Sequence, residues 1–299
     1  MTAWMRSASA FADLLEGAAA AMRDSPLREG SVVRLPRRGR LLVTGDIHDN
    51  PLHYDAVVRA AELGRSPDNH LVLHELIHGE RLMGGVDMSH RMLARVAELV
   101  LRHPLQVHPI LANHEIAQYR GQHISKGAGD NLELFDAGLE WVYGDEAEVA
   151  AVAIGAFVAA MPIAIRCENG AFVSHSLPAE SQYARFDQTV FARDLVEADF
   201  DGPTGAAYLM TWGRGHSAAH LGRLGREWGV RLFLSGHAHA PDGVDYRPPN
   251  QLILNTDHDQ GRFLELDLAA DAPEAKTLLS RALPVRSYVD LALLGGADA

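Results

Sequence analysis

The sequence predicts an α/β fold, because short apolar strands alternate with amphipathic helices along most of its 299 residues. Three of these strands, at residues 41–44, 71–73 and 107–111, end directly before acidic, amide or imidazole side chains. Open α/β sheets bind ligands beyond the carboxyl ends of their strands. The pattern therefore predicts both a layered core and the sheet edge at which a site would lie.

The chain is expected to begin with a helix at residues 8–22. Two acidic residues interrupt this Ala-rich stretch and no basic segment precedes it, which favours an amphipathic helix over a secretory signal. A short edge strand is expected at residues 32–36. Asn50 followed by Pro51 predicts the start of a helix over residues 51–63, because Asn caps helices and Pro fits their first turn.

The remaining elements continue the same alternation. Asn169 and Gly170 predict a hairpin between strands at residues 163–166 and 171–173, because Asn-Gly favours a two-residue hairpin turn. Further strands are expected at residues 231–234, 251–255 and 262–266, and helices at residues 89–101, 149–161, 222–228 and 287–294.

We expect one domain over residues 1–299. Its core would span about residues 40–268, with an excursion of loops and helices over about residues 117–148. The residues from 269 to 299 would form a peripheral tail. A chain that is 47% hydrophobic is long enough to bury a sizeable core in this arrangement.

Composition restricts the partners of the protein. Its 27 basic and 39 acidic residues give a net charge of -12, the wrong sign for general nucleic-acid binding. The single cysteine, Cys167, excludes an internal disulfide framework and fits a reducing compartment. No uninterrupted apolar run reaches the roughly 18 residues of a membrane span, so we expect a cytoplasmic protein that does not contact membranes.

The side chains at the strand ends form a chemically consistent set. Asp46 and His48 are two residues apart and would point to the same side of an extended chain. Histidines combined with carboxylate and amide oxygens suit Mn, Fe or Zn, and two such ions can clamp a phosphate and activate a water. The set is large enough for two divalent ions. Its members are Asp46, His48, Glu75, Asn113, His114, His175, His237 and His239.

The order and spacing of these residues resemble the calcineurin-like metallophosphoesterase superfamily, and within it most closely the phosphoprotein phosphatase branch. The resemblance implies a four-layer α/β/β/α sandwich built on two mixed sheets. The motifs that carry it, over roughly residues 40 to 260, are Gly45-Asp46-Ile47-His48, Asn113-His114-Glu115, His175 and Gly236-His237-Ala238-His239.

The resemblance also implies an activity. The protein would hydrolyse a phosphomonoester, either a phosphoprotein or a small phosphoester, through a hydroxide that bridges two metal ions. In this scheme Glu75 takes the place of the bridging carboxylate and His114 protonates the leaving oxygen. One metal would be held by Asp46, His48 and His239, and the other by Asn113, His175 and His237.

The second motif of the family is altered in this chain. His78 replaces the aspartate that orients the catalytic histidine, and a charged His78 would depress the pKa of His114. Gly79 replaces a phosphate-binding arginine. Arg214 and Arg120 are candidates for the lost phosphate contact, with surface ion pairs as the alternative for both.

Two other interpretations stay open. His74 and His78 flank Glu75 with the spacing of zinc metallopeptidases, in which a helix directs both histidines to one metal. The motif directly follows a predicted strand, however, which favours a strand end, and the phosphoesterase interpretation gives His74 only the place of a family glycine. The altered motif also fits a phosphatase fold that is catalytically weak or inactive.

Overall fold

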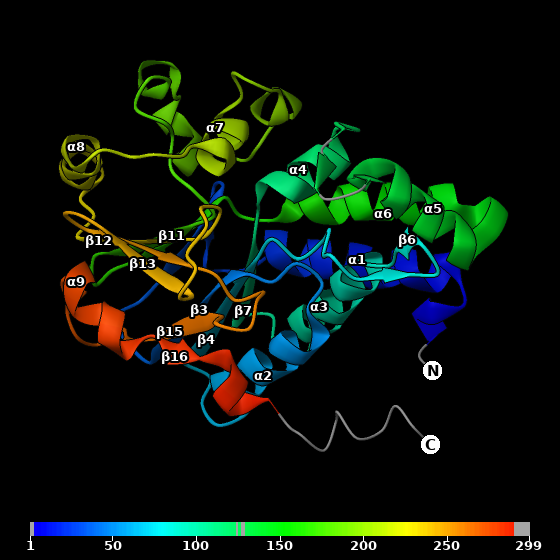
Figure 1. The fold of residues 1–299 in the computed structure, drawn as a ribbon, viewed down its shortest axis with the longest axis horizontal. Coiled ribbons are helices and arrows are strands. Elements are labelled where there is room, and N and C mark those ends of the chain that lie inside the picture. Colours follow the sequence, from blue (N-terminus) through cyan, green and yellow to red (C-terminus); the bar gives the residue numbers. More distant parts are fainter. Residues whose placement is uncertain (1–2, 124, 127–128, 290–299) are drawn as a thin grey trace.

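The computed structural model describes residues 3–123, 125–126 and 129–289, which form two large mixed sheets (Figure 1). In spatial order, the larger sheet consists of β1 (Arg28–Glu29), β2 (Val32–Leu35), β10 (Ala164–Cys167), β11 (Ala171–Ser174), β12 (Leu232–Ser235), β14 (Gln251–Leu254) and β13 (Val244–Arg247). The smaller sheet consists of β16 (Leu283–Pro284), β15 (Arg262–Asp267), β3 (Arg40–Asp46), β4 (Asn69–His74) and β7 (Val107–Ile110). Two short hairpins pair β5 (Leu82–Met83) with β6 (Val86–Asp87) and β8 (Ser125–Lys126) with β9 (Gly129–Asp130).

Helices cover the outer faces of both sheets, so the four-layer sandwich is confirmed (Figure 1). The helix α2 packs on β3 and β4, and Trp228 at the end of α8 packs on Phe233 of β12. The α-helices are α1 (Ala8–Arg23), α2 (Pro51–Ala61), α3 (His90–Arg102), α4 (Asn113–Tyr119), α5 (Asn131–Tyr143), α6 (Ala147–Ala160), α7 (Ala206–Trp212), α8 (Ala218–Trp228) and α9 (Ala275–Leu278). Short 3-10 helices lie at Ala3–Met5, Gly144–Glu146, Tyr183–Arg185, Gln188–Ala192, Glu197–Phe200, Leu279–Arg281 and Val285–Tyr288.

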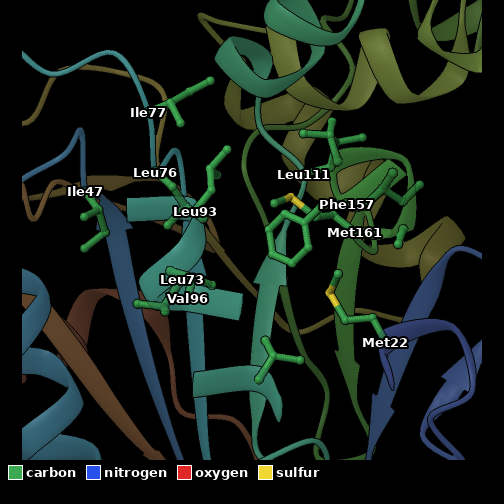
Figure 2. Packing of buried hydrophobic residues seen from close by; sticks show 14 of the residues in the cluster. Met22, Ile47, Leu73, Leu76, Ile77, Leu93, Val96, Leu111, Phe157 and Met161 are labelled. Atoms are coloured by element: carbon green, nitrogen blue, oxygen red, sulfur yellow. The ribbon is translucent and has the colours of Figure 1, made fainter. Parts of the chain in front are cut away.

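The alternation of side chains along each strand separates two hydrophobic cores. Leu41 and Val43 of β3 point between the sheets, whereas Leu42 belongs to the cluster beneath the helices. Figure 2 shows part of this second cluster, with Leu73 of β4 and Val96 of α3 among its members. Because every residue of β3 and β4 but Arg40 is buried, the ends of these strands are held on a rigid support.

The cysteine lies in the core between the sheets. Cys167 ends β10 and is 3% exposed. Burial raises the pKa of its thiol to about 12. The thiol therefore contributes to packing as a small apolar group.

Most predicted elements are present within a few residues of their expected bounds. Asn50 caps α2 by accepting a hydrogen bond from the backbone N–H of His53, and the turn at Asn169 and Gly170 joins β10 to β11 in antiparallel pairing. One expectation is wrong: the strand at residues 32–36 is not at the edge, because the two-residue β1 pairs outside it.

The structure describes only part of the expected C-terminal helix. Val285–Tyr288 forms a 3-10 helix, and most of the helix expected at residues 287–294 lies outside the described residues. In the part of the chain that the structure describes, no helix combines the length and apolar composition needed to span a bilayer.

Candidate metal centre

Six of the eight expected side chains converge at the carboxyl ends of the central strands. Asp46 is the last residue of β3, and Asn113 begins α4 a few residues after β7. The other four follow the ends of β3, β4, β11 and β12; they are His48, Glu75, His175 and His237. Segments far apart in the sequence therefore supply one cluster, because parallel strands place their carboxyl ends together.

One group of donors comprises Asp46, His48 and Glu75, whose ligand atoms lie within 4.8 Å of one another. His48 Nε2 is 3.4 Å from Glu75 Oε2, and His48 Nδ1 is 3.0 Å from the carbonyl oxygen of Ile77. Since a carbonyl only accepts, Nδ1 carries the proton. The Nε2 lone pair of His48 is thereby directed to the two carboxylates.

A second group shares Glu75 with the first. It comprises Glu75, His175 and His237, again within 4.8 Å. His175 Nε2 is 2.6 Å from Asn113 Oδ1, 3.1 Å from His237 Nδ1 and 3.5 Å from Glu75 Oε1. Glu75 is thus placed between two sets of donors, the position that a bridging carboxylate requires.

The electrostatics of both groups fit divalent cations. Burial, with the Glu75 carboxylate as the next cause, raises the pKa of Asp46 well above its usual range. Burial also lowers the pKa of His175 well below its usual range and that of His237 to about 3, so both imidazoles are neutral. Neutral imidazoles and crowded carboxylates are the forms that bind metals, and a cation would relieve the repulsion between the acids.

The backbone around these donors is strained. Of the six described non-glycine residues with left-handed backbone conformations, five lie at or beside the donors: His48 (φ 44°), Asp49 (φ 49°), Glu75 (φ 50°), His78 (φ 60°) and His237 (φ 64°). Each such conformation costs roughly 1–3 kcal/mol and persists where surrounding packing imposes it. The extended geometry expected after Asp46 is therefore wrong: a left-handed turn, and not strand alternation, directs His48 to the site.

The two remaining histidines of the set differ in their placement. His114 lies beside the cluster, with Nε2 3.9 Å from Glu75 Oε1 and its ring 5.3 Å from that of His48. His239 is exposed, and its ring centroid is 6.3 Å from that of His258. Among the described residues, His239 does not join either group of converging donors.

Sequence reasoning missed Asp87, whose carboxylate pairs with His78 beside His114. His78 Nδ1 is 2.9 Å from Asp87 Oδ2, both side chains are buried, and the His78 ring is 5.5 Å from that of His114. The other oxygen of Asp87 accepts from the backbone N–H of Ser89 at 2.7 Å. A signal existed in the sequence, because adjacent glycines at 84 and 85 predict the tight turn that brings Asp87 back towards His78.

The arginines are distributed unequally around the site. Arg214 donates to the carbonyl oxygen of His237 at 2.9 Å and so lies at the edge of the second donor group. Arg120 lies in an exposed network, paired with Glu197 at 2.9 Å and with Asp201, as the surface alternative envisaged.

A further arginine lies on the open side of the site. Arg81 pairs with Asp49 at 3.2 Å. Both line a cavity of about 850 Å³ that also includes His48. Sequence reasoning missed Arg81, because nothing in the spacing distinguishes it from a solvated side chain.

The glycine that replaces the family arginine is required by close packing. A Cβ atom on Gly79 would lie 2.2 Å from the carbonyl oxygen of His48 and 3.2 Å from Asp49 Cβ. Any side chain at this position would displace the loop that carries His48. The path of the His48 loop therefore leaves no room for an arginine at position 79.

The geometry contradicts the metallopeptidase alternative. His74 ends β4, and Glu75 and His78 have left-handed conformations, so no helix presents the two histidines on one face. His74 Nε2 contacts the carbonyl oxygen of Thr44 at 2.8 Å, while His78 Nδ1 faces Asp87. The two imidazoles therefore do not converge on one metal.

Comparison with known proteins agrees with a two-sheet α/β sandwich that carries clustered side chains able to bind metal ions. Residues 39–241 match the family model for calcineurin-like phosphoesterases, and the chain belongs to that family. It is accordingly a metallophosphoesterase, a hydrolase. A search of curated protein sequences gives no match.

Solved structures with the same fold include two phosphatases. A protein serine/threonine phosphatase from Saccharomyces cerevisiae is similar with a TM-score of 0.62 and 15% identity, over 86% of this chain and 82% of that one. A cold-active protein-tyrosine phosphatase from a psychrophilic Shewanella species is similar with a TM-score of 0.53 and 12% identity, over 84% and 80% of the two chains. At these identities the similarity establishes the fold.

Proposed function

We propose that the protein hydrolyses phosphomonoesters at a centre of two divalent metal ions, Mn, Fe or Zn. The observation that carries the proposal is the sharing of Glu75 between two groups of converging donors. Asp46 and His48 would hold one ion with Glu75, and Asn113, His175 and His237 would hold the other with it. His239, which lies outside both groups, would have to turn its imidazole towards Asp46 to act as a ligand.

Bound ions would polarise a phosphoryl oxygen and lower the pKa of a water molecule at the site. The protein supplies the remaining functions. His114 lies beside Glu75 and is the candidate to protonate the leaving oxygen, and the paired His78 and Asp87 adjoin its ring. General acid catalysis of this kind contributes about 10²–10⁴-fold.

The phosphate would be contacted from two sides. Arg214 lies beside His237, and Arg81 lines the cavity that opens beside His48. A guanidinium binds phosphate oxygens through paired hydrogen bonds. Arg120, held by two acids, has no part in this proposal.

The substrate would be a phosphoprotein or a small phosphoester, and the cavity beside His48 is large enough to receive the leaving group of either. The single cysteine fits a reducing compartment, and we propose the cytoplasm as the location.

The test pairs metal analysis with a substrate screen. The purified protein should bind two divalent ions per chain and hydrolyse phosphomonoesters faster than phosphodiesters. A protein that binds two ions but cleaves neither class would instead be an inactive member of the fold, as the altered second motif allows. A protein that binds none would refute the proposal.

A further inference from the structure

One buried histidine beside the donors has no part in the proposed reaction. His74 is 0% exposed and occupies the end of β4, one residue before Glu75. Its ring lies next to Asp46 and Gly236. A Cβ atom added to Gly236 would lie 2.5 Å from His74 Cε1 and 2.1 Å from Asp46 Oδ1. The absence of a side chain at Gly236 thus makes room for this imidazole.

The contacts of His74 determine where its proton lies. Nε2 is 2.8 Å from the carbonyl oxygen of Thr44, which can only accept a hydrogen bond, so Nε2 carries the proton. Its Nδ1 lies 3.7 Å from Asp46 Oδ1. With its single proton on Nε2, the imidazole presents a lone pair at Nδ1.

The lone pair on His74 Nδ1 determines which nitrogen of His175 carries the proton. His74 Nδ1 is 3.1 Å from His175 Nδ1, so His175 must donate from Nδ1 for this contact to be favourable. His175 Nε2 is then unprotonated and faces Asn113 Oδ1 at 2.6 Å and His237 Nδ1 at 3.1 Å. A cation held by His175 Nε2 and Asn113 Oδ1 together would make this close approach favourable.

We propose that His74 is a positioning residue, which accepts the Nδ1–H of His175 and thereby holds the Nε2 lone pair of His175 towards the second metal position. The inference rests on the role of His175 as a ligand in the proposed function. Ligating histidines commonly donate their other N–H to a carboxylate, carbonyl or water, and here a neutral histidine, itself held by Thr44, takes that place.

Two variants of matched size test this role. His74→Asn retains an oxygen acceptor that reaches His175 Nδ1, whereas His74→Leu has nearly the same shape but no acceptor. Both lose the contact with Thr44 and the ring volume. Zinc binding to the metal-free proteins is measured by calorimetry, with thermal unfolding of the metal-free proteins as the control for folding.

We expect two zinc ions per chain in the wild type and in His74→Asn. In His74→Leu the weaker zinc site should lose about 10–100-fold in affinity, the usual effect of losing such a partner. Equal zinc affinities in the two variants would overturn the inference. Wild-type protein that binds zinc normally but cleaves no phosphoester would instead overturn the proposed function alone.

Nitrogen-15 NMR of histidine-labelled wild type keeps the test independent of the variants. We expect His74 protonated at Nε2 and His175 protonated at Nδ1, with zinc shifting the signal of His175 Nε2. A zinc-induced shift at His74 Nδ1 that matches direct coordination would make His74 a ligand and overturn the positioning role.

Discussion

Glu75 is the side chain on which both donor groups depend. It has one methylene more than the aspartate expected from the family motif, and its backbone is left-handed (φ 50°). The turn brings its carboxylate within 3.4 Å of His48 and 3.5 Å of His175. The longer side chain and the unusual backbone together place the carboxylate between the two groups.

Replacing Glu75 by Gln should therefore affect both metals. The amide keeps the size but loses the charge that balances two cations, so we expect weaker binding of at least one ion and hydrolysis reduced to background. Metal content and hydrolysis of an aryl phosphate measure this. Glu16→Gln, an exposed position on α1, is the control and should change neither. Two retained ions with full activity in Glu75→Gln would contradict the bridging role.

The family motif has an aspartate where this chain has His78. Asp87 supplies a carboxylate beside His78 instead. Asp87→Asn would place an amide against His78 Nδ1 and reverse the hydrogen bond, forcing the imidazole to move its proton. We expect hydrolysis of alkyl phosphates such as phosphoserine to fall by up to about 10²-fold, with a smaller loss on aryl phosphates, whose leaving groups need little protonation. The ratio of kcat values for the two substrates is the measurement.

His114→Asn should shift the same ratio in the same direction. A matched control is the half-buried Asp68→Asn, which breaks a pair with Arg38 and should leave the ratio unchanged. Equal losses on alkyl and aryl substrates in both site variants would remove His114 from the role of acid and leave it a phosphate contact.

At the scale of elements, strands and helices were largely predictable because hydrophobic periodicity and turn residues are local signals. Strand ends identified most of the donors for the same reason. The pairing of His78 with Asp87 was not predicted, because it depends on the path of the β5–β6 hairpin. The exposed position of His239 and the left-handed turn at His48 depend on tertiary packing, which spacing alone does not reveal.

The loop at Gly79 offers a test at this scale. In Gly79→Ala, the added methyl group would collide with the carbonyl of His48, and we expect a loss of about 1–3 kcal/mol in unfolding free energy together with weaker metal binding. Urea denaturation of the metal-free protein and zinc calorimetry measure the two effects. Gly64→Ala, where a Cβ meets nothing within 4 Å, is the control. Unchanged metal affinity in Gly79→Ala would show that the loop relaxes without cost.

At the scale of the whole molecule, a second buried histidine pair links stability to pH. His70 Nδ1 is 3.2 Å from His108 Nε2 on neighbouring strands of the smaller sheet, away from the metal donors. Burial lowers the pKa of His108 to about 3. Between pH 6.5 and 3 the unfolded chain therefore binds a proton that the folded protein excludes, and stability falls as the pH is lowered through this window.

The variant His108→Gln should remove this dependence. Between pH 7.5 and 5.5, one such histidine costs the wild type about 1.4 kcal/mol of unfolding free energy. Over the same pH interval, the unfolding free energy of the variant should fall by about 1.4 kcal/mol less than that of the wild type. Urea denaturation of the metal-free proteins measures this difference. The exposed His123→Gln is the control. Parallel pH profiles for wild type and His108→Gln would show that His108 gains its proton without unfolding.

The burial of Cys167 has a practical consequence for spectroscopy. Thiol reagents attack the thiolate, which is scarce at neutral pH when the pKa is about 12 and is also enclosed between the sheets. A cysteine introduced at an exposed site, such as Trp141 on α5, would therefore accept a fluorophore or spin label alone. Distances from such a label to a paramagnetic ion such as Mn²⁺ can then be measured in a protein whose natural cysteine is left in place.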